Sequence, residues 1–326
     1  MDPVHAPPVF IDGPTVDRLL DWPSVVDAMA SGHQLPVGPV ASSFNDYGDN
    51  SIMNLSAWID GLGAAVKSCS LFPNNMSRTP PVETVQGIVI LYDGQDGHPK
   101  AMIDGASLTR WKTVGDSLLG AQYLAAPDPE CLLIVGAGVI GETAAVAYPA
   151  LFPSIRRILV WNRNSSRVEE VALRLKDGLT DIVVEGTRDL QQAAGEADII
   201  SCATRATEPV ILGKWLRPGQ HLDLIGAYLE DMREVDDDAM QRADLYTDKH
   251  DKSITTNGEF LIPIQNGAIT EASIKGDLYA LARQGPPDRD PAAITLFKNG
   301  GGAHMDLMVA DLIYRLHNAQ KAAQAD

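Results

Sequence analysis

A glycine pattern directly follows a short apolar run near the middle of the chain. Residues 131–135 are Cys-Leu-Leu-Ile-Val, and Gly136, Gly138 and Gly141 follow in the spacing G-x-G-x-x-G. The first glycine permits a tight turn, the second lets a pyrophosphate approach the backbone, and the third lets a helix pack closely on the strand. Backbone N–H groups at the start of that helix bind anions. The pattern predicts a dinucleotide phosphate loop, to which Val139 and Ile140 also contribute.

The next apolar run, residues 157–161, ends at the position where an NAD-binding protein usually carries an acidic residue for the ribose 2′-hydroxyl. Here that residue is Asn162, which has no charge. Three polar residues that suit a 2′-phosphate follow it, and they are Arg163, Asn164 and Arg167. Guanidinium groups pair well with phosphate. The segment therefore favours NADP(H) over NAD(H), although NAD(H) stays possible and a solvated turn is the simpler alternative.

Four further residues have side chains that suit anion binding or proton transfer. They are Lys67, Lys112, Tyr228 and His304. Lys67 lies within an apolar run, where an ammonium group is costly unless it is paired or functional. Histidine titrates near neutral pH, which suits proton transfer. Simpler interpretations stay open for the others: Lys112 as a solvated helix charge, His304 as a capping or packing residue, and Tyr228 as ordinary packing.

The elements that must position these residues fall into two groups. From about residue 130 to 295, apolar runs at 182–184, 198–202 and 221–225 alternate with helical stretches, which predicts an α/β, doubly wound parallel sheet of the Rossmann type. The earlier segment has strand-like runs at 64–71 and 87–92, and it predicts a smaller α+β domain. A helix over 107–125 joins the two, and a helix from 307 to about 323 returns to the first. We expect domains at 1–122 plus 300–326 and at 123–299.

Composition limits the partners. The chain has 326 residues, 45% hydrophobic and 21% charged, with a formal net charge of -17. Nothing resembles the basic patch that neutralises nucleic acid or anionic lipid, so neither is expected as a partner. Cys69, Cys131 and Cys202 lack metal-ligand spacing and are expected to be buried thiols in a reducing compartment. No metal is expected, and the N-terminus has no secretory pattern, so we expect a cytoplasmic protein.

Four local patterns together resemble the ornithine cyclodeaminase and mu-crystallin family over nearly the whole chain. They are Lys67 with Pro73-Asn74-Asn75 after it, residues 101–113, the glycine loop, and residues 297–306. The resemblance implies a homodimer whose first domain binds the substrate and dimerises, while the Rossmann domain holds the nicotinamide cofactor. Thr113 is then expected near the cofactor phosphates, and Thr204 among the cofactor-binding residues.

Departures from the family pattern favour one chemistry. Ornithine cyclodeaminases carry an aspartate in a Gly-Gly-Asp pattern where this chain has Gly226-Ala227-Tyr228. The spacing of Asp231, Arg233 and Glu234 is instead similar to mu-crystallin, whose branch includes ketimine reductases. The resemblance thus implies NAD(P)H-dependent reduction of a small anionic imino acid, with Δ1-pyrroline-2-carboxylate or Δ1-piperideine-2-carboxylate giving L-proline or L-pipecolate. Ornithine cyclodeamination, reduction of an acyclic imine such as iminosuccinate, alanine dehydrogenation, and non-catalytic ligand carriage remain alternatives.

The expected roles follow from this chemistry. Lys67 and Lys112 bind the substrate carboxylate, although Lys112 replaces an arginine usual in the family and offers a point charge rather than a bidentate fork. His304 or Tyr228 donates a proton or hydrogen bond to the ring nitrogen. Asp306 is expected to cap the last helix, and the residues Asp231, Arg233 and Glu234 to form a structural charge cluster.

Overall fold

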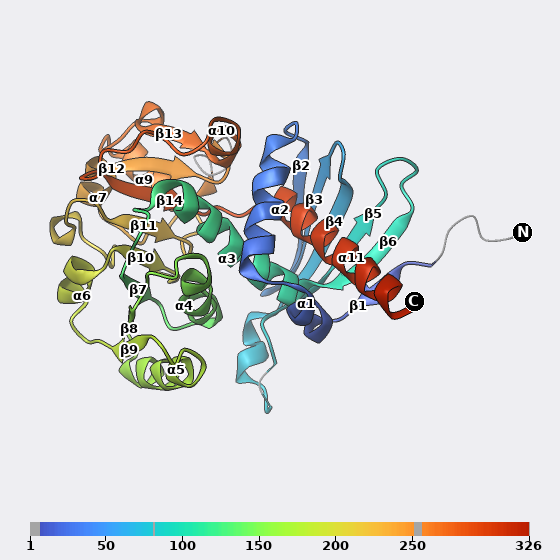
Figure 1. Ribbon diagram of the computed structural model, residues 1–326, viewed down its shortest axis with the longest axis horizontal. Coiled ribbons are helices and arrows are strands. Elements are labelled where there is room, and N and C mark those ends of the chain that lie inside the picture. Colours follow the sequence, from blue (N-terminus) through green and yellow to red (C-terminus); the bar gives the residue numbers. More distant parts are fainter. Residues whose placement is uncertain (1–6, 81, 251–255, 326) are drawn as a thin grey trace, which may run out of the picture. The chain divides into compact units, whose positions relative to one another are not determined.

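The computed structural model describes residues 7–80, 82–250 and 256–325, and its contacts divide the chain into two units (Figure 1). Unit 1 is Met1–Lys112 with Gly301–Asp326, and unit 2 is Thr113–Gly300. The division falls within helix α3 (Gly105–Leu124), whereas the sequence placed it at residue 122. The helix expected over 107–125 is confirmed.

Unit 1 contains a mixed sheet whose described strands have the order β1-β6-β5-β4-β3-β2. Neighbours pair antiparallel except β1 and β6, which are parallel. The strands are β1 (Val9–Ile11), β2 (Val40–Tyr47), β3 (Asn50–Ile59), β4 (Gly63–Leu71), β5 (Val85–Tyr92) and β6 (Pro99–Asp104). The helices are α1 (Gly13–Leu19), α2 (Trp22–Gln34) and α11 (Ala303–Ala325), with a 3-10 turn at Pro73–Ser77. Both predicted strands are confirmed, and the long β2–β3 hairpin is an addition.

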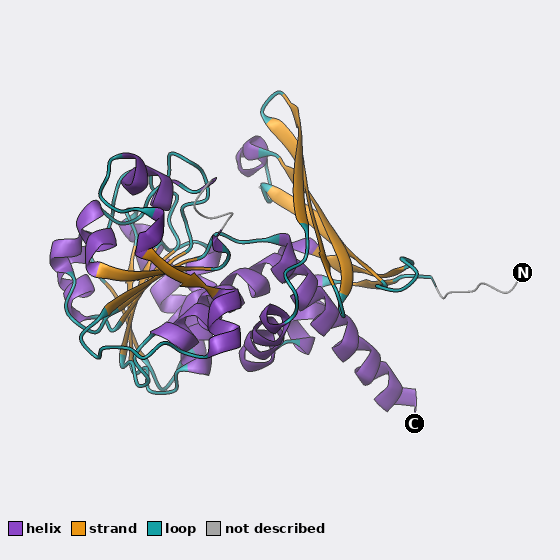
Figure 2. Ribbon diagram, turned by 90° about the horizontal axis from the view of Figure 1, so that it is seen from above, coloured by secondary structure: helices purple, strands orange, loops and turns teal. Residues whose placement is uncertain are grey.

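Alternation along β4 decides which side chains face the helices. Gly63, Ala65, Lys67 and Cys69 are buried, and the residues between them are half-buried. Successive side chains of a strand point to opposite faces, so Lys67 lies on the covered face of the sheet. Helices α2 and α11 pack against one another, α11 packs on β3 and β4, and Figure 2 shows them on one face of this sheet.

Unit 2 is a parallel sheet with helices around it, as the sequence predicts. Its strands are β7 (Cys131–Val135), β8 (Arg157–Trp161), β9 (Val183–Gly186), β10 (Ile199–Cys202), β11 (His221–Leu224), β12 (Ala243–Thr247), β13 (Ile274–Asp277) and β14 (Ile294–Lys298). Its helices are α4 (Val139–Leu151), α5 (Ser165–Gly178), α6 (Leu190–Glu196), α7 (Asp237–Arg242), α9 (Gly258–Gln265) and α10 (Leu278–Gln284), with 3-10 turns at Gly213–Trp215 and Glu271–Ser273. Strands β7, β10, β11 and β14 are buried throughout, which is typical of parallel strands covered on both faces.

The strand order of unit 2 reverses at β7. The described strands run β13-β12-β14-β11-β10-β7-β8-β9, with every pairing parallel. The chain proceeds outward from β7 to β8 and β9, then returns to the other side of β7 with β10 and β11. This reversal is the Rossmann switch point, where dinucleotides bind outside the carboxyl ends of the strands.

Two expectations about the chain as a whole can be compared with the structure. Cys69, Cys131 and Cys202 are buried free thiols, as expected. Among the described residues, no helix combines the length and apolar character that a membrane span needs.

Candidate functional site

The glycine loop has the geometry of a phosphate cradle. Gly136 has a φ of 113°, and a Cβ there would lie 2.6 Å from the carbonyl oxygen of Ala203. A Cβ on Gly141 would lie 2.0 Å from the carbonyl oxygen of Gly136. A Cβ on Gly138, which caps the N-terminus of α4, would meet no atom within 4 Å. Gly136 and Gly141 are therefore required by packing, while Gly138 borders the open space that an anion at the helix N-terminus would fill.

The end of β8 supports this loop from the side. The amide of Ala137 lies 3.5 Å from Asn162 Oδ1, and Arg167 Nε donates to the carbonyl oxygen of Ala137 at 3.0 Å. Asn164 caps α5 by accepting from the backbone N–H of Ser166. Arg163 is exposed. Arg167 thus holds the loop backbone, whereas Arg163 is a solvent-exposed cation that directly follows Asn162.

Two loops follow β10 and β11, and the first of them lies next to the phosphate loop. Thr204 follows β10, and both its N–H and its Oγ1 donate to Glu234 at 2.7 Å. Tyr228 follows β11, is 52% exposed, and accepts a hydrogen bond from Arg205 at 3.4 Å. The sequence predicts a structural charge cluster of Asp231, Arg233 and Glu234. In the structure Arg233 pairs with Asp237 at 2.8 Å, and the side chain of Glu234 is buried.

In unit 1 a buried ion pair joins β4 to α11. Lys67 Nζ lies 3.0 and 2.9 Å from the two carboxylate oxygens of Asp306, and the two side chains are 5% and 1% exposed. The helix begins at Ala303, four residues before the predicted start, so Asp306 sits in its first turn. The expectation that Asp306 caps the helix is therefore wrong. Its carboxylate instead holds the buried ammonium of Lys67 in place.

The other two unit 1 candidates lie on neighbouring elements. Lys112 on α3 is buried, and a Cβ on Gly301 would lie 3.2 Å from its Nζ. Burial raises the pKa of the Cys69 thiol, and Lys67, Asp306 and Lys112 all act on it electrostatically. Both lysines therefore lie close enough to Cys69 of β4 to act on it electrostatically.

His304 also lies in the first turn of α11 rather than in an open loop. It is buried, and its ring packs edge-on against His33 of α2 with the centroids 5.4 Å apart. His33 Nδ1 lies 2.7 Å from the carbonyl oxygen of Met29, which requires a proton on that nitrogen. His33 was not predicted from the sequence, although it lies on the buried stripe of α2.

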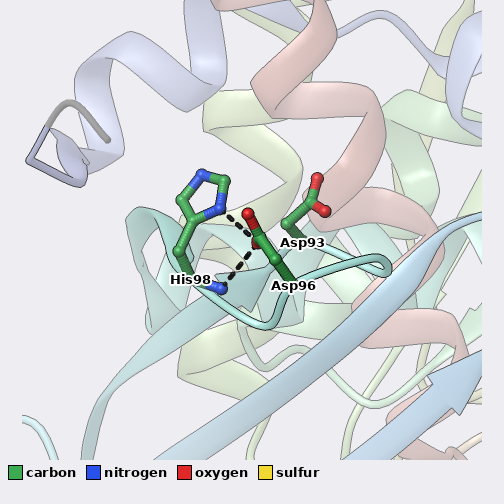
Figure 3. A group of neighbouring side chains, drawn as sticks. All are labelled: Asp93, Asp96 and His98. Carbon is green, nitrogen blue, oxygen red and sulfur yellow. Dashed lines mark hydrogen bonds and ion pairs between the residues drawn. The ribbon is translucent and has the colours of Figure 1, made fainter. Parts of the chain in front are cut away.

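Two features remain to be described, the expected cofactor residue Thr113 and a group of titratable side chains in one turn of unit 1. Thr113 lies on α3, and its carbonyl oxygen accepts from Asn299 Nδ2 at 2.8 Å. Asp93, Asp96 and His98 gather in the turn between β5 and β6 (Figure 3). There His98 Nδ1 lies 2.6 Å from Asp96 Oδ1, and Lys100 Nζ lies 4.0 Å from Asp93. These contacts stabilise the turn, and we assign no metal site to it.

Comparisons with known proteins agree with this arrangement. The chain is 43% identical over 312 residues to the Δ1-pyrroline-2-carboxylate reductase of Paracoccus denitrificans, covering 95% of this chain and 97% of that protein. It is 31% identical to the rat ketimine reductase mu-crystallin, and the match covers 72% of this chain and 70% of that protein. Among solved structures, the chain resembles Thermococcus litoralis Δ1-pyrroline-2-carboxylate reductase in complex with NADH and L-proline, with a TM-score of 0.86 and 25% sequence identity. The match covers 96% of this chain and 98% of that chain. Residues 27–321 match the ornithine cyclodeaminase/mu-crystallin family, and the chain belongs to that family.

Proposed function

We propose that this protein is an NAD(P)H-dependent ketimine reductase that converts Δ1-pyrroline-2-carboxylate, or its six-membered homologue Δ1-piperideine-2-carboxylate, to the L-amino acid. The observation that carries the proposal is the 43% identity over 95% of the chain to a reductase of the first compound. The phosphate cradle of unit 2 and the buried lysines of unit 1 supply the two binding functions that such an enzyme needs.

Unit 2 fits a dinucleotide. Gly138 leaves open space at the N-terminus of α4, where the backbone N–H groups and the helix dipole favour a pyrophosphate. The uncharged Asn162 and the exposed Arg163 favour a 2′-phosphate, so NADPH is the preferred cofactor in this proposal. When bound, the nicotinamide supplies the hydride that the reduction needs.

Unit 1 supplies charge for the substrate. An acidic chain with a net charge of -17 repels an anion unless local cations attract it. Lys67 and Lys112 provide two such cations, and the substrate carboxylate binds to them in our proposal. Asp306 neutralises part of this charge and fixes the position of Lys67 Nζ.

The imine nitrogen must carry a proton for its carbon to accept a hydride. His304 is the preferred donor, because an imidazole exchanges protons near neutral pH. Tyr228 is the second candidate, because its exposed hydroxyl can donate a hydrogen bond. The tyrosine at this position also disfavours cyclodeamination, for which the family uses an aspartate.

We further propose a homodimer formed through the open face of the unit 1 sheet. This face carries both apolar and polar side chains, and among the apolar ones Ile52 and Trp58 on β3 are 40% and 46% exposed. Register places them in one layer with Val66 of β4 and Ile90 of β5. Exposed apolar patches of this kind are typical of association surfaces.

The proposal is tested by following NADPH and NADH oxidation with each cyclic imine, and with pyruvate or oxaloacetate plus ammonia. We expect fast turnover of a cyclic imine with NADPH preferred. Turnover restricted to the oxo acids with ammonia would assign the protein to acyclic imines. Ammonia release from L-ornithine without added reductant would assign it to the cyclodeaminases, and ligand binding without any turnover would favour a carrier.

A further inference from the structure

One buried carboxylate connects two loops of unit 2. Glu234 is fully buried beyond the end of β11. Its Oε1 accepts from both the N–H and the Oγ1 of Thr204, and its Oε2 accepts from the N–H of Gly226, all at 2.7 Å. Thr204 follows β10 and Gly226 follows β11, so a single side chain joins the loops at the carboxyl ends of adjacent strands.

These loops are in contact with one another and with the phosphate loop. A Cβ on Gly226 would lie 1.8 Å from the carbonyl oxygen of Thr204 and 2.6 Å from Glu234 Oε1. A Cβ on Gly136 would lie 2.6 Å from the carbonyl oxygen of Ala203. The Thr204 loop therefore packs against both the Gly226 loop and the phosphate loop.

The surroundings fix Glu234 in this position. Glu259 accepts from the N–H groups of Glu234 and Val235 at 2.8 and 3.0 Å. Lys298, also fully buried, donates to the carbonyl oxygen of Leu224 at 2.7 Å. Burial raises the pKa of Glu234, and the charge of Lys298 and the hydrogen bonds from Thr204 and Gly226 oppose that rise.

The chemistry of the three donors calls for a carboxylate at this position. Two donors approach one oxygen and a third approaches the other, so both oxygens must accept. A glutamine has only one accepting oxygen, and its NH2 group would face the N–H of Gly226. Because a buried carboxylate is expensive, its presence between two loops of the crevice indicates a requirement for their fixed spacing.

The two halves of a doubly wound sheet bind the two halves of a dinucleotide. The adenosine half lies over β7, β8 and β9, and the nicotinamide half lies over β10, β11 and β14. We propose that Glu234 is a positioning residue that sets the nicotinamide-binding half of the crevice by fixing the Thr204 and Gly226 loops. The inference rests on the cofactor assignment of the proposed function.

The test compares two ligands that share the adenosine half. For Glu234→Gln, we expect the dissociation constant of NADPH to rise roughly 10- to 100-fold, the effect of losing a hydrogen bond to a charged group. The dissociation constant of 2′,5′-ADP, which has no nicotinamide half, is expected to stay within about twofold. Glu208→Gln is the matched control, because Glu208 is an exposed carboxylate on the same loop.

Further outcomes decide between the possible roles. Unchanged NADPH affinity, or an equal loss for both ligands, would overturn the positioning role. If Glu234→Gln fails to fold, Thr204→Val and Thr204→Ser replace it. Valine removes the Oγ1 donor and should weaken the binding of NADPH but not of 2′,5′-ADP. Serine keeps the donor and should keep the affinity for NADPH. A wild-type protein that binds neither ligand would overturn both this inference and the cofactor assignment. Normal binding with no imine turnover would overturn the proposed reaction and leave the role of Glu234 standing.

Discussion

Removing one partner of the Lys67–Asp306 ion pair is expected to destabilise the protein strongly. The two groups are 2.9 and 3.0 Å apart, and their side chains are 5% and 1% exposed, so either single substitution leaves an uncompensated charge in the core of unit 1. Breaking such a buried pair costs about 3–5 kcal/mol of the free energy of unfolding. For a unit of this size each kcal/mol lowers the melting temperature by roughly 3 °C, which predicts a fall of roughly 10 to 15 °C.

The assay is a double-substitution cycle followed by thermal unfolding and urea titration. Lys67→Met and Asp306→Leu each remove one charge and keep a side chain of similar shape, and the double variant removes both. Because two apolar groups can replace a buried ion pair at little cost, the double variant should recover most of the loss. Single variants within about 2 °C of the wild type, or a double variant whose loss equals the sum of the single losses, would refute this reasoning.

Four further predictions concern the cofactor, the substrate and pH. Gly138→Ala should weaken NADPH binding with little change in melting temperature. Gly141→Ala should lower the melting temperature, because a Cβ at Gly141 would meet backbone and one at Gly138 would not. Ligand titration measures the first effect and calorimetry the second. Arg163→Ala should raise the dissociation constant of NADPH roughly tenfold more than that of NADH, and equal losses would argue against a 2′-phosphate site. Lys67→Met should abolish turnover or raise KM while NADPH still binds, as measured by steady-state kinetics beside fluorescence titration. Burial and the charge of Arg289 lower the pKa of His221 to about 3, below its unfolded value of 6.5. The stabilising contribution of His221 is therefore present above pH 6.5 and is lost as the pH falls. Between pH 7 and 4.5, urea titration should show the wild type losing about 2.5 kcal/mol more of its free energy of unfolding than His221→Gln.

The Rossmann unit was predictable because its signals are local. A strand followed by G-x-G-x-x-G and a helix lies within about twenty residues, and buried parallel strands are continuous apolar runs. The β2–β3 hairpin was missed because β2 is largely polar and exposed. Its signal was the two-residue turn at Gly48-Asp49, where Gly48 has a φ of 60° and which is typical of tight hairpins.

The site was only partly predictable, since its key contacts are distant in sequence. Lys67 was identified as an unusual buried charge, but its partner Asp306 is 239 residues away and no local pattern joins them. The three glycines at 300–302 concealed the start of α11, so His304 was expected in a loop. Glu234 was grouped with its neighbour Arg233, because sequence spacing cannot show that its side chain turns into the core beside Thr204.

The central claim is that a hydride passes from NADPH to the imine carbon of Δ1-pyrroline-2-carboxylate. The most direct measurement incubates the protein with this imine and NADPH carrying deuterium at both C4 positions, followed by mass spectrometry of the product. We predict L-proline with one deuterium at C2 and one NADPH consumed per molecule formed. Proline without the label, or no proline while the cofactor stays bound and unoxidised, would contradict the claim.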